Sequence, residues 1–235
     1  MRKSILFLLV LTLFFVFPGA ELRASGFGGT FSEGYRMGQL TKFSIKGLLI
    51  KSGEGQLLLG RESTPYSITT GDGTERINPW YFSADPSVCN TLNEKAGDYV
   101  VLHYVQSRVA NTFVQDTDYT VDKVYGVTRK DPVPRLYEVA KDRGGKSEGV
   151  RVGRIVKVSY KGNVNKTYEL MLQQGDAGNQ FKHMTITDDG MYQYAIKVLM
   201  SGKKVKVYYV ESFFVFPGTR DTNYQVWKIE VPEDL

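Results

Sequence analysis

The chain has 235 residues, a hydrophobic fraction of 42% and a formal net charge of +5, which is the composition of an ordinary globular protein. Arg2, Lys3, Glu21 and Arg23 together carry +2 of that charge, so the chain after residue 26 carries +3. This mild excess excludes the strong basic stripe expected of a dedicated nucleic-acid binder, but it allows an acidic partner.

Residues 1–26 have the pattern of a secretion signal. Arg2 and Lys3 precede an apolar run, 5–17, and small residues follow it at 24–26. The run is shorter than the roughly 20 residues that a membrane-spanning helix needs. We therefore expect cleavage near residue 26 and a periplasmic or secreted bacterial protein, with an uncleaved N-terminal anchor as the alternative. No later run is long enough to cross a membrane.

Cys89 is the only cysteine, so an intramolecular disulfide is impossible. An exported domain without disulfides favours the bacterial periplasm over a eukaryotic extracellular setting. Cys89 lies on the apolar face of an expected helix, which predicts a small core residue rather than a nucleophile.

One stretch of sequence occurs twice. Residues 33–47 read EGYRMGQLTKFSIKG and residues 148–162 read EGVRVGRIVKVSYKG. Residues 97–107 likewise match 202–212, at an offset of 105 instead of 115. The repeat predicts a duplicated unit, with the ten extra residues of the first copy placed in a polar loop at 61–78.

The repeat divides the chain into segments. We predict a signal peptide at 1–26, a flexible glycine-rich lead-in at 27–34, a first unit at 35–127 and a second at 148–235. The intervening stretch, 128–147, has the charges, prolines and glycines of a linker. Within that linker, 136–141 is expected to form one or two helical turns.

Each unit shows the same order of expected elements. Runs of β-branched and aromatic residues predict strands at 37–45, 56–60, 79–82, 99–107 and 120–127 in the first unit. The second unit has them at 151–160, 167–173, 181–187, 204–212 and 224–231. A helix is expected between the third and fourth strands of each unit. It begins near Asp85 and ends at Gly97 in the first unit, and it is capped by Asp188 or Asp189 and ends at Gly202 in the second.

This order resembles the OB-fold, a five-stranded Greek-key barrel. The resemblance is one of topology and covers both units, so the expected fold is mainly β, with one helix per unit and two tandem OB-like barrels. A small SH3-like barrel is the alternative. Gly38 and Gly153 lie where a barrel strand must coil, and the apolar register slips between Ile155 and Val158, as at a bulge.

The OB resemblance implies ligand binding on the face of strands two and three and through the loops after strands one and four. The loops after strand four hold Arg108 and Phe113 in the first unit and Phe213, Phe214, Phe216 and Arg220 in the second. Exposed aromatic rings beside arginine can stack on bases, sugars or a partner's apolar side chains. The alternative is that these segments extend the strands and pack against the other barrel.

Cations follow strand one in both units. Lys46 and Lys161 represent this group, at matching positions of the repeat. They border the usual OB ligand surface and could meet an anionic glycan, a lipid headgroup or nucleic acid. A solvated strand face is the alternative.

No catalytic motif is present in the sequence. There is no nucleophile elbow or phosphate loop, and no metal or cofactor is expected. The second copy has Tyr208 at the position of His103, which predicts a half-exposed strand position for this histidine and not a metal ligand. The Asp-Thr-x-Tyr segments at 116–119 and 221–224 are good turn formers.

The sequence thus favours a non-enzymatic binding or adaptor protein of the bacterial cell envelope, which engages a protein or an anionic polymer through barrel loops. One alternative is an envelope hydrolase with a site between the barrels, where a pair of carboxylates would be needed. The other is extracytoplasmic nucleic-acid binding.

Overall fold

The computed structural model describes residues 29–46, 52–60, 79–108, 116–162, 167–175, 180–215, 220 and 222–233. The expected signal peptide lies outside the described residues, and so do the loop 61–78, Phe113 and Phe216.

The protein is mainly β. Its first half contains β1 (Thr30–Lys46), β2 (Ser52–Leu59), β3 (Pro79–Ala84), η1 (Pro86–Val88), α2 (Cys89–Glu94), β4 (Tyr99–Ser107) and β5 (Tyr119–Gly126). The second half contains β6 (Leu136–Glu138), β7 (Gly145–Lys161), β8 (Thr167–Gln174), β9 (Phe181–Ile186), α3 (Asp189–Ser201), β10 (Lys204–Ser212) and β11 (Tyr224–Glu230). The expected order of strands and helices is confirmed in both halves.

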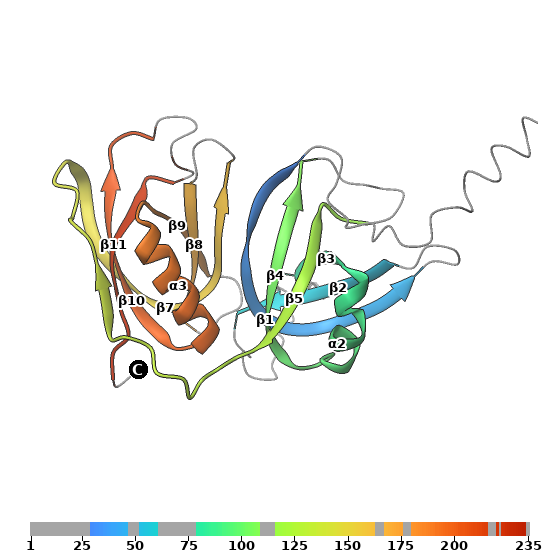
Figure 1. Cartoon of the computed structure of the whole chain (residues 1–235). Coiled ribbons are helices and arrows are strands. Elements are labelled where there is room, and N and C mark those ends of the chain that lie inside the picture. Colours follow the sequence, from blue (N-terminus) through green and yellow to red (C-terminus); the bar gives the residue numbers. More distant parts are fainter. Residues whose placement is uncertain are drawn as a thin grey trace, which may run out of the picture.

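The strand pairings close on themselves twice. β1 pairs antiparallel with β2 and β4, β2 with β3, and β4 with β5, while β3 and β5 pair in parallel. We call these five strands the N-terminal ring. β7, β8, β9, β11 and β10 repeat the same pairings and form the C-terminal ring. The two rings lie side by side (Figure 1).

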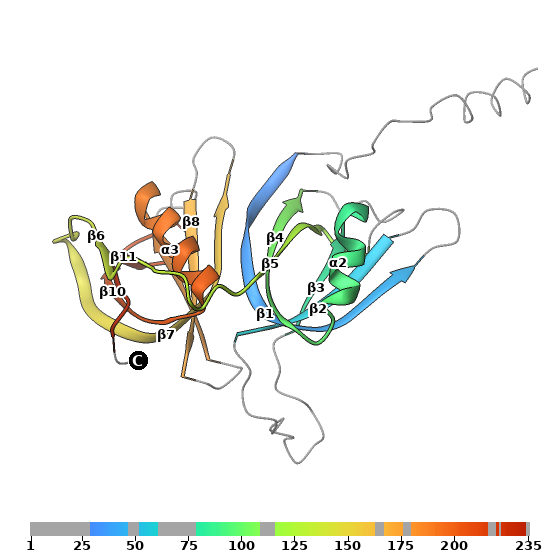
Figure 2. The ribbon, with the colours of Figure 1, turned by 60° about the horizontal axis from the view of Figure 1, so that its bottom comes forward.

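A shared edge joins the two rings. Along the first half of β1, Ser32 to Arg36 pair antiparallel with Lys161 to Lys157 of β7. All strands therefore belong to one 11-stranded sheet, in which β1 and β7 are long and curve around their own rings (Figure 2). The β1–β7 pairing fixes which side chains of one ring face those of the other.

A chain of polar contacts crosses this junction. His103 of β4 lies 2.5 Å through Nδ1 from Asp122 and 3.1 Å through Nε2 from Glu33, and the Tyr160 hydroxyl donates to Glu33 at 2.6 Å. Burial, and to a smaller extent this hydrogen bond, raises the pKa of Tyr160 to about 12, so the hydroxyl remains a donor at neutral pH. His103 is 5% exposed, not half-exposed as expected, because Tyr35 packs on its ring and both carboxylates enclose it.

Four segments differ from the expectation. β2 begins at Ser52 instead of residue 56, because its first residues pair with β1 and β3. β1 begins at Thr30, inside the expected lead-in, because its first half has β4 and β7 as partners. β7 likewise begins at Gly145, paired with β10. The stretch expected to form helical turns instead forms β6, whose backbone pairs with β11. In each case a partner strand that is distant in sequence decides the local conformation.

Several local expectations are confirmed. The Asp188 side chain accepts from the Met191 amide and caps α3, which ends at Gly202 with φ of 61°. The bulge lies between Ile155 and Lys157. Cys89 is a free, buried thiol.

Candidate ligand-binding site

Arg36 is a buried cation at the junction between the rings. It is 8% exposed, and its guanidinium carbon lies 4.5 Å from the ring centroid of Trp80, 5.1 Å from that of Tyr104 and 5.2 Å from that of Tyr119. Its Nε has no hydrogen-bond partner, and no carboxylate among the described residues pairs with it. Cation–π contacts stabilise a desolvated charge by about 2 kcal/mol, whereas burying the charge costs several kcal/mol. Arg36 is therefore short of an anionic partner.

An open pocket of about 600 Å³, here the N-terminal pocket, begins at these aromatic rings. It is lined by Pro79, Trp80, Tyr81, Arg108, Asp116, Thr117, Asp118 and Tyr119. The Trp80 indole nitrogen is buried without a hydrogen-bond partner among the described residues, while the Tyr81 ring is 57% exposed. The pocket lining thus combines aromatic surface with one arginine, Arg108, and two aspartates, Asp116 and Asp118, while Arg36 lies against its Trp80 and Tyr119 rings.

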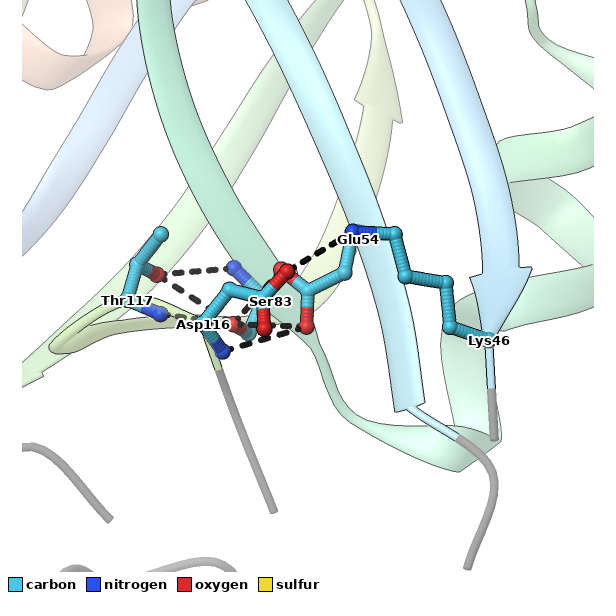
Figure 3. A network of polar contacts seen from close by, with 5 residues as sticks. All are labelled: Lys46, Glu54, Ser83, Asp116 and Thr117. Carbon is cyan, nitrogen blue, oxygen red and sulfur yellow. Dashed lines mark hydrogen bonds and ion pairs between the residues drawn. The ribbon is translucent and has the colours of Figure 1, made fainter. Parts of the chain in front are cut away.

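A polar network holds one wall of this pocket (Figure 3). The Ser83 hydroxyl lies 2.9 and 3.1 Å from the two Glu54 oxygens, and the Ser83 amide donates to Thr117. The Asp116 amide donates to Glu54, and Lys46 forms an ion pair with the Asp116 carboxylate at 2.8 Å. The Asp-Thr-x-Tyr turn is therefore anchored to β2 and β3, which supports its expected structural role and also fixes the pocket wall.

The C-terminal ring carries a related cluster at matching positions of the repeat. Arg151 lies 5.5 Å from the ring centroid of Tyr209, and the Tyr209 and Tyr224 rings are 5.3 Å apart. Lys182 occupies the position of Trp80, with its Nζ 3.3 Å from the Tyr224 ring centroid. Arg151 also donates to the Gln174 side chain at 3.1 Å. Arg151 thus has a side-chain hydrogen-bond partner, whereas no hydrogen bond joins Arg36 to a side chain in the described ranges.

This cluster also opens on a pocket, here the C-terminal pocket, of about 610 Å³. It is lined by Phe181, Lys182, His183, Phe213, Val215, Thr222, Asn223 and Tyr224. Because its lining comes from the third strand, the end of the fourth and the turn before the fifth, it is the counterpart of the N-terminal pocket. The two pockets share a frame but differ in chemistry.

Positive charge at the ring junction acts on Tyr104, which packs against Arg36, and on His183, which lines the C-terminal pocket. Arg36 and Lys157 are directly opposite one another on β1 and β7. Burial alone would raise the pKa of Tyr104, but Lys157 and Arg36, together with the nearby Ser32 and Ser159 hydroxyls, outweigh burial and lower it. Desolvation and then Lys157 lower the pKa of His183, so this histidine is neutral at pH 7. Lys157 is paired with Glu169 at 2.7 Å, so of the two facing cations only Arg36 has no carboxylate partner among the described residues.

The residues predicted from the loops after strand four are divided between the pockets. Arg108 lines the N-terminal pocket, and Phe213 lines the C-terminal pocket at the matching position. Phe214 is 78% exposed and outside the described lining. Arg220 donates to Ser212 and Gln225, both at 2.9 Å, and so ties the ends of β10 and β11 together.

The two predicted lysines are both engaged in ion pairs. Lys46 pairs with Asp116 at the surface, and Lys161 pairs with the buried Glu169 at 2.6 Å. The structure therefore brings Arg108 and Phe213 to pocket walls and gives Lys46, Lys161 and Arg220 contacts within the protein. Whether any of these residues binds a ligand stays a prediction.

The sequence contained a signal for the residues that were missed. Arg36 and Arg151 recur in register within the repeat, and so do Tyr104 and Tyr209. An arginine that is repeated within an apolar strand points to a cation packed against aromatic rings in each unit, and of the two Arg36 is buried and Arg151 partly exposed. Trp80 could not be found this way, since its matching residue is Lys182.

No group of three or more histidine, cysteine or acidic side chains suitable for a metal ion occurs among the described residues. Within the same ranges, no helix has both the length and the apolar character needed to span a bilayer.

Residues 29–131, which include β1 to β5, match a domain of unknown function (DUF8785). No curated protein matches the sequence. Among solved structures, the wild-type single-stranded DNA binding protein from Thermus aquaticus is 14% identical, over 86% of this chain and 93% of that one. A deletion mutant of the same protein is 16% identical, over 88% and 97%. Both TM-scores are 0.23, too low to establish a common fold.

Proposed function

We propose that this chain is a non-enzymatic binding protein of the bacterial cell envelope, exported by its N-terminal segment, that holds an extended anionic polymer at the N-terminal pocket. Its frame would be two tandem OB-like barrels that arose by duplication. The repeated pairing order and the helix between the third and fourth strands of each ring support this frame over an SH3-like one.

The observation that carries the proposal is the state of Arg36. A guanidinium that is 8% exposed has three aromatic rings around it and no carboxylate partner among the described residues. An anionic group beside Trp80 and Tyr119 would supply that partner, and the rings would hold the apolar faces of the same ligand. The exposed Tyr81 ring adds a stacking surface on the same strand.

Replacing Arg36 with glutamine should weaken polymer binding by about 10-fold to 100-fold, the range for loss of a charge-assisted hydrogen bond. Fluorescence anisotropy with labelled oligothymidylate and labelled polygalacturonate measures this for a nucleic acid and an anionic glycan. The slope of log affinity against log salt should become shallower in the variant. Arg143→Gln, at an exposed arginine, is the matched control and should bind as the wild type does.

The two labelled probes also distinguish the candidate ligands. Binding of oligothymidylate alone would favour the nucleic-acid alternative, and binding of polygalacturonate alone would favour a glycan. Equal affinities of the Arg36 and Arg143 variants for every probe would contradict the proposal.

The C-terminal pocket offers a second comparison. Phe213→Ser should weaken binding of the same polymer several-fold because Phe213 lines that pocket, whereas Phe214→Ser should not. Both side chains are exposed, so the Tm of each variant should stay close to that of the wild type. A different result would be that wild type captures a protein from envelope extract that Phe214→Ser does not capture, while both bind the polymer equally. That result would identify a protein, and not the polymer, as the ligand of this surface.

One observation favours the hydrolase alternative. Glu33 and Asp122 form a pair of carboxylates at the junction between the rings. Both are hydrogen-bonded to the same buried imidazole, an arrangement that also suits a structural lock. If Glu33→Gln abolished glycan hydrolysis without changing stability, the hydrolase would be favoured. If it only lowered stability, the role of Glu33 would be structural.

A further inference from the structure

A small third pocket lies where the end of the N-terminal ring meets the C-terminal end of α3. Its volume is about 180 Å³, and we call it the junction pocket. It is lined by Tyr99, Val127, Arg129, Arg154, Ser201, Gly202, Lys203 and Lys204. Four of these side chains are basic and none is acidic, whereas the N-terminal pocket is lined by Asp116 and Asp118 beside Arg108.

Backbone and side-chain contacts hold the lining in place. The Thr128 amide donates to the Met200 carbonyl at 2.9 Å, which ties the segment after β5 to the last turn of α3. Arg154 donates through Nη1 to the Gly202 carbonyl at 2.7 Å. The Cβ of any residue replacing Gly202 would lie 2.9 Å from Val127, so this glycine permits the close approach. The pocket is part of the packed junction between the rings.

Two like charges that face each other in this pocket lower the stability of the folded protein. Lys204 of β10 stands directly opposite Arg154 of β7, and like charges that face each other across strands are destabilising. Arg129, Lys203 and Lys204 have no ion pair with any carboxylate in the described part of the chain. Lys203 reaches only the Asp131 carbonyl, at 3.4 Å.

The size of the pocket limits the ligand. A water molecule takes about 30 Å³ of liquid volume, so 180 Å³ has room for one phosphate group and a few waters. Pockets for drug-sized ligands begin at about 300 Å³. The arginine forks suit planar pairs of phosphate oxygens.

We propose that the junction pocket binds one phosphate group, either free phosphate or a phosphomonoester. The group would accept hydrogen bonds from Arg129, Lys203 and Lys204, the three lining cations that have no ion pair in the described part of the chain. Because the lining comes from both rings, the bound group would fasten one ring to the other. This site is separate from the polymer pocket at Arg36.

Thermal unfolding of the full chain tests the proposal. Raising inorganic phosphate at constant ionic strength, with chloride as the balancing anion, should raise Tm saturably, as expected when a ligand binds only the folded state. Lys204→Gln should bind phosphate about tenfold more weakly. It should also be no less stable than wild type without phosphate, because the facing pair is relieved. Lys197→Gln, at an exposed lysine of α3 outside the lining, is the control and should respond as wild type does.

Two further arms identify the source of the phosphate group. Glycerol 3-phosphate should reproduce the Tm rise if a phosphomonoester fits. Vesicles containing phosphatidic acid should retain wild type and lose Lys204→Gln if the group is a lipid headgroup. Arg36→Gln should keep the full phosphate response, which separates this site from the polymer site. The proposal would be overturned if phosphate raised the Tm of Lys204→Gln as much as that of Lys197→Gln. It would also be overturned if phosphate raised the Tm of wild type no more than chloride does.

Discussion

Replacing Glu169 with glutamine should destabilise the protein by about 3–5 kcal/mol, the cost of leaving a buried charge without its partner. Glu169 is 6% exposed and binds the ammonium groups of Lys157 at 2.7 Å and Lys161 at 2.6 Å. The Lys157 side chain is 8% exposed, so the amide would leave its charge buried and uncompensated. Urea unfolding measures the change.

Glu54 provides the matched control, since it occupies the same position of the repeat. It is 8% exposed, but its oxygens accept from the Ser83 hydroxyl and the Asp116 amide instead of from a buried lysine. Glu54→Gln should therefore cost less, about 1–3 kcal/mol. A double variant, Glu169→Leu with Lys157→Met, should recover most of the stability. A loss in Glu169→Gln no greater than in Glu54→Gln would refute this account of the junction.

The second large effect is expected at Gly153. A Cβ placed there would lie 1.9 Å from the Gln173 carbonyl oxygen, and one at Gly38 would lie 2.0 Å from that of Leu58. Gly153→Ala must push β7 and β8 apart where their backbones approach most closely, at an expected cost of about 3 kcal/mol. Circular dichroism during thermal unfolding measures it.

Gly126 is the control for this prediction, because a Cβ at that position meets nothing within 4 Å. Gly126→Ala should be neutral or stabilising by up to about 1 kcal/mol. If both alanine variants unfolded at the wild-type temperature, the close approach of β7 and β8 would not be the reason that position 153 requires glycine.

Much of the fold could be predicted from the sequence because its signals are local. Strands β4 and β10 have the predicted bounds, and the cap at Asp188 and the stop at Gly202 follow from single residue types. The segments that differed, β6 and the early start of β1, take their conformation from strands distant in the chain. No local pattern encodes such a pairing.

The candidate site divides in the same way. Arg108 and Phe213 were found because they directly follow strands of the expected barrel. Arg36 was not, since its significance depends on three rings from three other strands. His103 shows the same limit, because its enclosure depends on Glu33 and Asp122, which lie on separate strands.

The most direct test of the central claim uses the two tryptophans of the chain. With Trp227 replaced by phenylalanine, Trp80 is the only source of indole fluorescence, and it lies in the wall of the N-terminal pocket. Titration with whichever polymer binds by anisotropy should change this fluorescence saturably, at the same Kd, and the change should weaken with Arg36→Gln. Undiminished polymer binding with no change in Trp80 fluorescence would place the ligand elsewhere and contradict the account.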